Sequence, residues 1–101
     1  MNVARMNELH AKEGCGDELR EFLLKLEPII QSSQGCEKCE VLECDTELGR
    51  YVLFEFWDSI ESHQNAAQQI SSEETSRILK LLQMPPSGDY FHRISELKAT
   101  L

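Results

Sequence analysis

The stretch "GRYVLFEFWDSIESHQNAA", residues 49–67, decides the fold. Up to Trp57 nearly every side chain is large and apolar, with one carboxylate, Glu55, among them. Alternate residues of a strand point to opposite faces. One face therefore carries Tyr51, Leu53, Glu55 and Trp57, and the other carries Val52, Phe54 and Phe56. A strand with one face in water alternates apolar with polar residues, so this pattern predicts a strand over residues 50–57 that is covered on both faces.

A helix is predicted directly after this strand. The segment "DSIE" at 58–61 is typical of a capping box, with Asp58 as the cap and Glu61 three residues later. Apolar residues then recur at helical spacing and give an inward stripe. Its members are Ile60, His63, Ala67 and Ile70. The pattern thus predicts that His63 faces the sheet.

The remaining segments predict one further strand at each end of the chain, one between, and two more helices. Residues 2–11 alternate as a strand, and strands are also predicted over 36–45 and within 87–97. A helix is predicted from about residue 17 to 33, capped by Asp17, weakened by Pro28 and ended by Gly35. Its apolar stripe is Leu19, Phe22, Leu23, Leu26, Ile29 and Ile30. "SSEE" at 71–74 begins another helix, whose expected inward residues are Ile78, Leu79 and Leu82.

The element order is therefore β-α-β-β-α(α)-β. This is the split βαβ arrangement, an α+β, ferredoxin-like fold with a four-stranded antiparallel sheet. A chain of 101 residues without a linker segment predicts a single domain over residues 1–101.

The second apolar face of the strand over 50–57 predicts a homodimer. Helices cover one face of such a sheet and leave Val52, Phe54 and Phe56 on the other. Burying each of these side chains is worth about 1.5–3 kcal/mol, and a single subunit has nothing left to cover them. A second subunit, packed sheet against sheet, is the simplest cover.

Charge and hydropathy exclude several classes of function. Eighteen acidic residues against ten basic ones give a net charge of −8. Such a surface repels nucleic-acid phosphates and anionic lipids. No apolar run approaches the roughly 18 residues that span a bilayer, and "MNVARMNELHAKEG" has no signal-peptide core. We therefore expect a cytoplasmic protein with no nucleic-acid or membrane partner.

These motifs together resemble the antibiotic biosynthesis monooxygenase (ABM) family of dimeric α+β barrel proteins. The family pattern is a Gly-Cys strand, an apolar strand ending Glu-x-Trp-Asp/Glu, and a helix with a histidine about six residues after the tryptophan. The matching residues are Gly35, Cys36, Glu55, Trp57, Asp58 and His63. The resemblance covers about residues 2–95.

The resemblance implies a homodimer with a small-molecule pocket in each subunit, between helices and sheet. Several members oxygenate quinol-like or anthrone-like aromatics with dioxygen and without any metal or organic cofactor. Others degrade haem, isomerise small metabolites, or have no known activity. A cofactor-free monooxygenase is thus the leading expectation, and a non-catalytic binding protein or an isomerase is the alternative.

Residue matches separate these branches. Trp57 and Arg77 match positions that line the pocket of the anthrone-oxidising members, whereas Leu53 replaces an asparagine that those enzymes carry. Asn7 matches a pocket asparagine of the haem-degrading members. Their helical tryptophan falls at His63, however, and their haem-ligating histidine falls at Glu73. Haem degradation is therefore disfavoured.

The resulting candidate site has catalytic and substrate-binding parts. The catalytic candidates are His63, Asn7 and Arg77, and the substrate-binding candidates are Trp57, Glu55 and Leu53. His63 has an ordinary pKa near neutrality and suits a general base, although a core histidine tied to a carboxylate or carbonyl fits the same pattern. Glu55 is either its partner or a structural ion pair with Arg77 or Arg5. Trp57 and Asn7 fit either a core or a pocket wall.

Four cysteines, Cys15, Cys36, Cys39 and Cys44, raise the question of a metal or redox site. A zinc C-x-x-C motif lies in a tight turn, whereas Cys36-x-x-Cys39 enters a strand, where positions three apart face opposite sides. The sequence thus favours reduced structural thiols over redox chemistry or a metal site.

Overall fold

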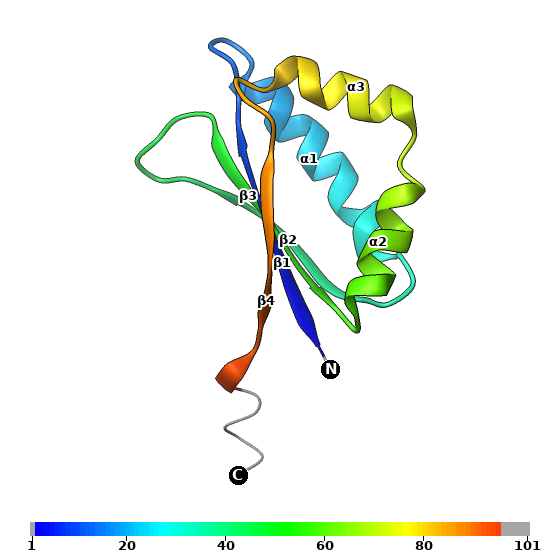
Figure 1. Ribbon diagram of the computed structural model, residues 1–101. Coiled ribbons are helices and arrows are strands. Elements are labelled where there is room, and N and C mark those ends of the chain that lie inside the picture. The colour runs from blue at the N-terminus through cyan, green and yellow to red at the C-terminus, as the bar shows by residue number, and fades with distance from the viewer. Residues whose placement is uncertain (1, 96–101) are drawn as a thin grey trace.

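The computed structural model describes residues 2–95 (Figure 1). Its elements, in chain order, are β1 (Val3–His10), α1 (Gly16–Gln31), β2 (Cys36–Glu43), β3 (Arg50–Trp57), α2 (Ile60–Gln68), α3 (Ser72–Leu81) and β4 (Ser87–His92). This order confirms the predicted ferredoxin-like α+β fold. Among the described residues, no helix is both long and apolar enough to cross a membrane.

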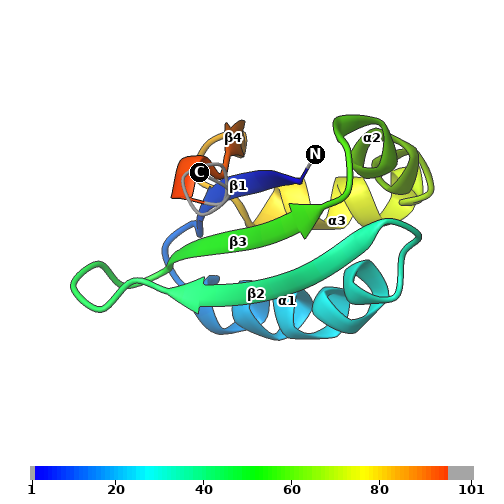
Figure 2. The same cartoon turned by 90° about the horizontal axis from the view of Figure 1, so that it is seen from below.

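The four strands form one antiparallel sheet in the order β2-β3-β1-β4. The three helices lie on the same side of this sheet (Figure 1), and a view from below shows α1 running beneath β2 and β3 (Figure 2). The register places Arg5 of β1 between Glu55 and Tyr90, and Asn7 between Leu53 and Gly88. Two rows of side chains from the three strands thus lie next to each other on the helix side.

Strand β3 has two covered or partly covered faces, as its sequence predicts. Its helix-side residues Tyr51, Leu53, Glu55 and Trp57 are all buried. Its other face carries the half-buried Val52, Phe54 and Phe56, with the exposed side chains of Met6, Leu42 and Phe91 on neighbouring strands. The centre of the sheet face away from the helices is therefore apolar, and charged residues share its rows: Glu8, Lys38, Glu40 and Asp89.

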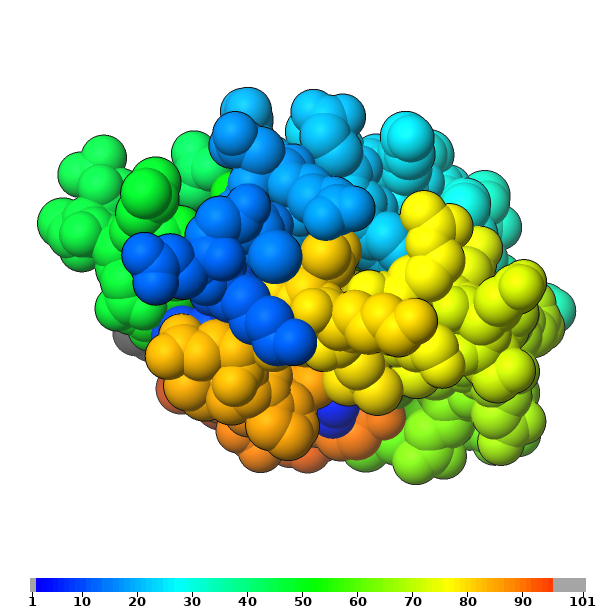
Figure 3. All heavy atoms as spheres, turned by 90° about the horizontal axis from the view of Figure 1, so that it is seen from above, coloured from blue at the N-terminus to red at the C-terminus, as the bar shows by residue number. Residues whose placement is uncertain are grey.

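The core lies between α1 and the sheet. Trp57, Leu19 and Leu23 are its largest fully buried side chains. Ile29 was expected on the inward stripe of α1 but is 58% exposed, because it lines a cavity and is not packed against the sheet. Seen from above, side chains of α3 lie between those of α1 and the start of β4 (Figure 3).

The ends of α1 differ from the sequence-based expectation. The helix begins at Gly16, and its N-cap is Cys15, which makes no side-chain capping bond. Asp17 is therefore a first-turn residue, where its charge favours the helix dipole, and not the cap. The helix continues through Pro28 to Gln31.

The caps of α2 and α3 follow local hydrogen bonds. Ser59, and not Asp58, is the N-cap of α2, because its side chain accepts the Ser62 amide at 3.1 Å. Ser71 caps α3 as predicted, accepting from the Glu74 amide at 3.1 Å. The capping signals thus predicted both helix starts, one of them a residue early.

The inward stripes of α2 and α3 are less buried than their spacing predicts. Neither helix has a fully buried residue, and Ile60 and Leu79 are 38% and 47% exposed. Leu82 is buried, but it lies just beyond α3. Part of the reason is geometric: His63 and Ala67 of α2 and Ile70 of the link to α3 line a cavity between the helices and the sheet.

The strands β2 and β4 end earlier than predicted, at Glu43 and His92. Residues 96 and 97 of the expected last strand lie outside the described residues. A β-bulge also interrupts β2 between Cys36 and Lys38. The alternation of apolar and polar residues in the sequence does not predict this bulge.

Gly35 joins the turn before β2 to the start of α2. Its φ of +87° lies in the left-handed region, and a Cβ there would collide with Ser62 and Asp58. The Asp58 amide donates to the Gly35 carbonyl at 2.9 Å. Glycine is therefore required for both conformation and space, and this contact ties the turn before β2 to the segment that precedes α2.

Candidate functional site

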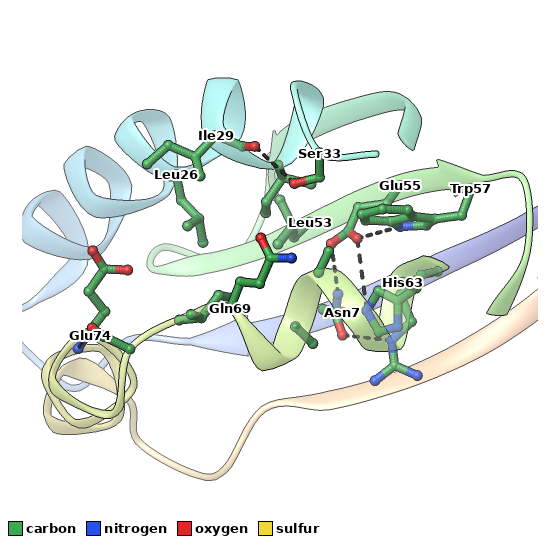
Figure 4. A pocket seen from close by; sticks show the side chains of 16 residues that line it. Asn7, Leu26, Ile29, Ser33, Leu53, Glu55, Trp57, His63, Gln69 and Glu74 are labelled. Carbon is green, nitrogen blue, oxygen red and sulfur yellow. Dashed lines mark hydrogen bonds and ion pairs between the residues drawn. The ribbon is translucent and has the colours of Figure 1, made fainter. Parts of the chain in front are cut away.

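A cavity of about 500 Å³ lies between the sheet and the helices. Its walls are mainly apolar, with Leu26 and Ile30 from α1, Leu53 from β3 and Ala67 from α2. Figure 4 shows the polar side chains gathered at one end, near Asn7 and His63, with Glu74 at the opposite end. A cavity of this size and character suits a small organic molecule.

The buried carboxylate of Glu55 is the centre of the polar end. Its Oε1 accepts the indole Nε1–H of Trp57 at 2.7 Å, and its Oε2 accepts the amide Nδ2–H of Asn7 at 3.3 Å. The Asn7 Oδ1 in turn accepts the Nε–H of Arg5 at 3.1 Å. Glu55 is only 3% exposed, so these donors replace the water that burial removes.

Burial raises the pKa of Glu55 above its ordinary value. The hydrogen bond from Trp57, the charge of Arg5 and the hydrogen bond from Asn7 act in the opposite direction, because each favours the carboxylate. Burial therefore raises the pKa of Glu55, and its three neighbours make this rise smaller than burial alone would.

His63 lies next to Glu55, and each nitrogen of its ring has a polar group nearby. Its Nδ1 is 2.6 Å from the hydroxyl of Tyr90, and its Nε2 is 4.0 Å from Glu55 Oε1. Its ring meets the Trp57 ring edge to face, with centroids 5.5 Å apart. Burial, and then the nearby charge of Arg5, lower the pKa of His63 below its ordinary value. The neutral imidazole is thus favoured, which is the form that accepts a proton.

Five of the six predicted site residues line this cavity: His63, Asn7, Trp57, Glu55 and Leu53. Arg77 does not. It is exposed on α3, and its guanidinium lies 5.9 Å from the centre of the Phe22 ring, in a separate surface depression. The structure does not bring Arg77 to this cavity, because α3 turns that side chain towards Phe22 of α1.

The structure adds two residues that the sequence did not single out as site residues. Arg5 lines the cavity and reaches Glu55 only through Asn7, so the direct ion pair considered for Glu55 does not form. Tyr90 fixes His63 and stacks below Arg5, with 4.6 Å between the guanidinium carbon and the ring centre. The alternation of β4 carries the signal for Tyr90, because it places Tyr90 on the helix-side face beside Arg5.

The cysteine pair is arranged differently from the simple strand alternation. The bulge sets Cys36 opposite Trp57 and Cys39 opposite Glu55, so both lie on the helix side and the expectation of opposite faces was wrong. Burial raises the pKa of Cys39 to about 12. All four cysteines are free, and no group of three potential metal ligands forms among residues 2–95.

Glu73, the position that corresponds to the haem-ligating histidine, does not line the cavity. It lies exposed in the first turn of α3. The residues present therefore do not fit a haem in the way that the resemblance to the haem-degrading members requires.

Comparison with known proteins gives a consistent family and fold. The family model described as antibiotic biosynthesis monooxygenase matches residues 2–76. Among curated proteins, no relative is found.

Solved structures with the same fold include Rv0793 from Mycobacterium tuberculosis, at 19% identity and a TM-score of 0.80 over 92% of this chain and 95% of that one. A mutant of SnoaB, a cofactor-independent oxygenase from Streptomyces nogalater, matches at 14% identity and 0.78 over 91% and 92%. PA3566 from Pseudomonas aeruginosa matches at 17% identity and 0.81 over 91% and 93%. At these identities the likeness establishes the fold alone.

Proposed function

We propose that this chain, which belongs to the antibiotic biosynthesis monooxygenase family, oxygenates a small electron-rich aromatic, quinol-like or anthrone-like, in the cavity described above. Dioxygen is the co-substrate, and no metal or organic cofactor takes part. Family membership and the resemblance in fold to a cofactor-independent oxygenase support this proposal.

His63 is the proposed general base. Its lowered pKa keeps the imidazole neutral near neutral pH, and its Nε2 faces the polar end of the cavity, 4.0 Å from Glu55. The role requires the tautomer in which Nδ1–H donates to the Tyr90 oxygen and leaves Nε2 free. The imidazolium formed by proton transfer is then stabilised by the carboxylate of Glu55.

The chemistry that follows is that of an activated carbanion. Removal of a proton from an anthrone-like substrate gives an enolate, which reduces dioxygen and forms a new carbon–oxygen bond. The resulting peroxide anion takes up a proton to give a hydroperoxide. The hydroperoxide then loses its remaining C–H proton together with hydroxide, as water, to leave a carbonyl, so one dioxygen is consumed and one water released for each CH₂ converted to C=O. The apolar walls keep bulk water from the enolate.

The observation that carries the proposal is the placement of His63. It is a half-buried, hydrogen-bonded imidazole at the polar end of a mainly apolar cavity of about 500 Å³. Desolvation and a fixed ring orientation are what a general base at this site needs.

The test is oxygen uptake with dithranol and with a naphthoquinol, measured above the uncatalysed rate. The wild-type protein should consume one dioxygen per substrate, and His63→Ala should lower the rate by about 10²–10⁴-fold. His92→Ala, which changes an exposed histidine at the end of β4, is the matched control and should leave the rate unchanged.

Other results would point to the alternatives. Binding of these aromatics without oxygen uptake would contradict the oxygenase and leave a binding protein. Solvent-proton exchange into a bound ligand without oxygen uptake would instead indicate isomerase-type chemistry.

We also propose that the protein is a homodimer formed through the open faces of two sheets. The apolar side chains of Val52, Phe54 and Phe56, with Met6 and Phe91 beside them, support this assembly.

A further inference from the structure

We propose that Arg5 binds an anionic oxygen of the ligand, so that the cavity selects aromatic compounds that carry a carboxylate or an ionised enol. This inference rests on the proposed function only in taking the cavity as the binding site of a small aromatic. It requires no turnover.

Arg5 is a half-buried cation without a carboxylate of its own. It forms no ion pair with any carboxylate among residues 2–95. Its Nε–H donates to Asn7 Oδ1, and its guanidinium lies over the Tyr90 ring. The two terminal nitrogens donate no hydrogen bond to any described residue, so a bidentate donor remains available for a ligand oxygen.

Glu55 does not neutralise this charge directly. Its two oxygens already accept from Trp57 and Asn7, and Asn7 stands between the carboxylate and the guanidinium. Arg5 nevertheless acts on the site through its field, because its charge lowers the pKa of both Glu55 and His63. The guanidinium is thus electrostatically part of the polar end while its terminal donors are unused.

The structure makes room for the guanidinium at Gly88. This residue pairs with Asn7 across β1 and β4, and a Cβ on it would occupy the space of the Arg5 guanidinium and of Asn7 Oδ1. Its φ lies outside the left-handed region, so space alone calls for glycine here. Gly88 therefore leaves free the space that the Arg5 guanidinium occupies.

The distribution of charge around the cavity indicates that a preference for anionic ligands would come from Arg5. Among the residues that line the cavity, Arg5 is the single Lys or Arg side chain within the described part of the chain. Besides Glu55, the lining holds one more acidic residue, Glu74, which lies at the opposite end (Figure 4). The chain carries a net charge of −8, so general attraction cannot draw an anion into the site. A preference for anions must therefore come from Arg5.

An anionic oxygen bound by Arg5 also orients the ring. The aromatic part would then lie against Leu53 and Trp57, with its polar edge below His63. The group that the base must reach is thereby brought to the end of the cavity where His63 stands.

The test is calorimetric titration without oxygen, using three probes of similar shape: a naphthoate, the matching neutral naphthamide, and hydroxynaphthoquinone, which is an ionised enol at neutral pH. Wild-type protein should bind at least one of the two anions more tightly than naphthamide. Arg5→Met should weaken binding of that anion by about 10- to 100-fold and leave naphthamide unchanged. Which of the two anions shows the effect identifies carboxylate or enolate as the natural group.

Three further variants make the result decisive. Arg5→Lys keeps the positive charge and should retain part of the preference for anions over naphthamide. Gly88→Ala keeps Arg5 but places a methyl group in the space of its guanidinium, and it should reduce anion binding. Arg20→Met, which removes an exposed arginine of α1, is the charge-matched control and should have no effect. Equal affinity of wild-type protein for all three probes, or binding of none, would overturn the inference even if Arg5→Met failed to fold. Oxygen uptake can fail independently of all these measurements, so the two proposals are separable.

Discussion

Glu55 and Trp57 are joined by a buried hydrogen bond along a single strand, in which the indole Nε1–H donates to Oε1 at 2.7 Å. Residues two apart on a strand share a face, so the apolar strand carries within itself the donor that its one carboxylate needs. Asn7 from the neighbouring strand satisfies the second oxygen. This arrangement keeps an acid in an apolar wall without a direct ion pair to an arginine or a lysine among the described residues.

The first prediction concerns the pH dependence of stability at Glu55. Because the folded-state pKa is raised above the ordinary 4.5, the native protein holds this proton more tightly than the unfolded chain. The contribution of Glu55 to the free energy of unfolding should therefore be fully present below pH 4.5 and be lost as the pH rises through the folded-state pKa. Urea unfolding of wild type and Glu55→Gln at several pH values should show their difference changing in that direction. A difference independent of pH would contradict the raised pKa.

The second prediction concerns Tyr90, which we interpret as a positioning residue for His63. Tyr90→Phe keeps the ring under Arg5 but removes the partner of Nδ1. We expect the nitrogen NMR signals of His63 to shift from one defined tautomer towards a mixture, with the folded state retained. If the variant keeps the wild-type signals, the hydrogen bond does not fix the tautomer.

The third prediction concerns assembly. Phe54→Asp places a charge on the apolar face of the sheet and should dissociate or unfold the protein, because an interface would bury that charge without a partner. Light scattering should give about twice the 11.6 kDa chain mass for the wild type and a smaller mass for the variant. Leu48→Asp, at a fully exposed loop position, is the control and should stay dimeric. A monomeric wild type at micromolar concentration would contradict the dimer.

The fourth prediction ranks the cysteines by reactivity. Hydrogen bonds from the backbone and side chain of Thr46 lower the pKa of the Cys44 thiol, whereas burial raises that of Cys39 to about 12. Since the thiolate is the nucleophile, iodoacetamide should modify Cys44 first and Cys39 last in the native protein. Mass spectrometry of timed samples gives the order, and early labelling of Cys39 would contradict its burial. Metal analysis of reduced protein is expected to give no stoichiometric zinc.

The sequence alone predicted those features that depend on alternation and local capping. Strand β3 was predicted with its observed bounds, and its parity placed Leu53, Glu55 and Trp57 on one face. The stripe of α2 placed His63 over them. These features depend on neighbours within a few residues along the chain, which is where sequence patterns are informative.

Features that depend on partners distant in sequence were missed or wrong. The contact between His63 and Tyr90 spans 27 residues, and the space for the Arg5 guanidinium depends on Gly88 of another strand. Arg77 points away because of how α3 packs on α1, and a bulge rotates Cys36 onto the face of Cys39. Helix rotation and bulges are set by tertiary packing, so a periodic pattern does not report them.

Trp57 is the one tryptophan of the chain, and it combines a buried ring, a hydrogen bond to Glu55 and a face on the cavity. The ultraviolet emission of the protein therefore originates almost entirely from the wall of the site. A ligand that enters, a proton that leaves Glu55 or a rotation of His63 each alters the surroundings of the same chromophore. The protein thus carries its own optical reporter, and stopped-flow fluorescence can follow ligand entry on unlabelled material.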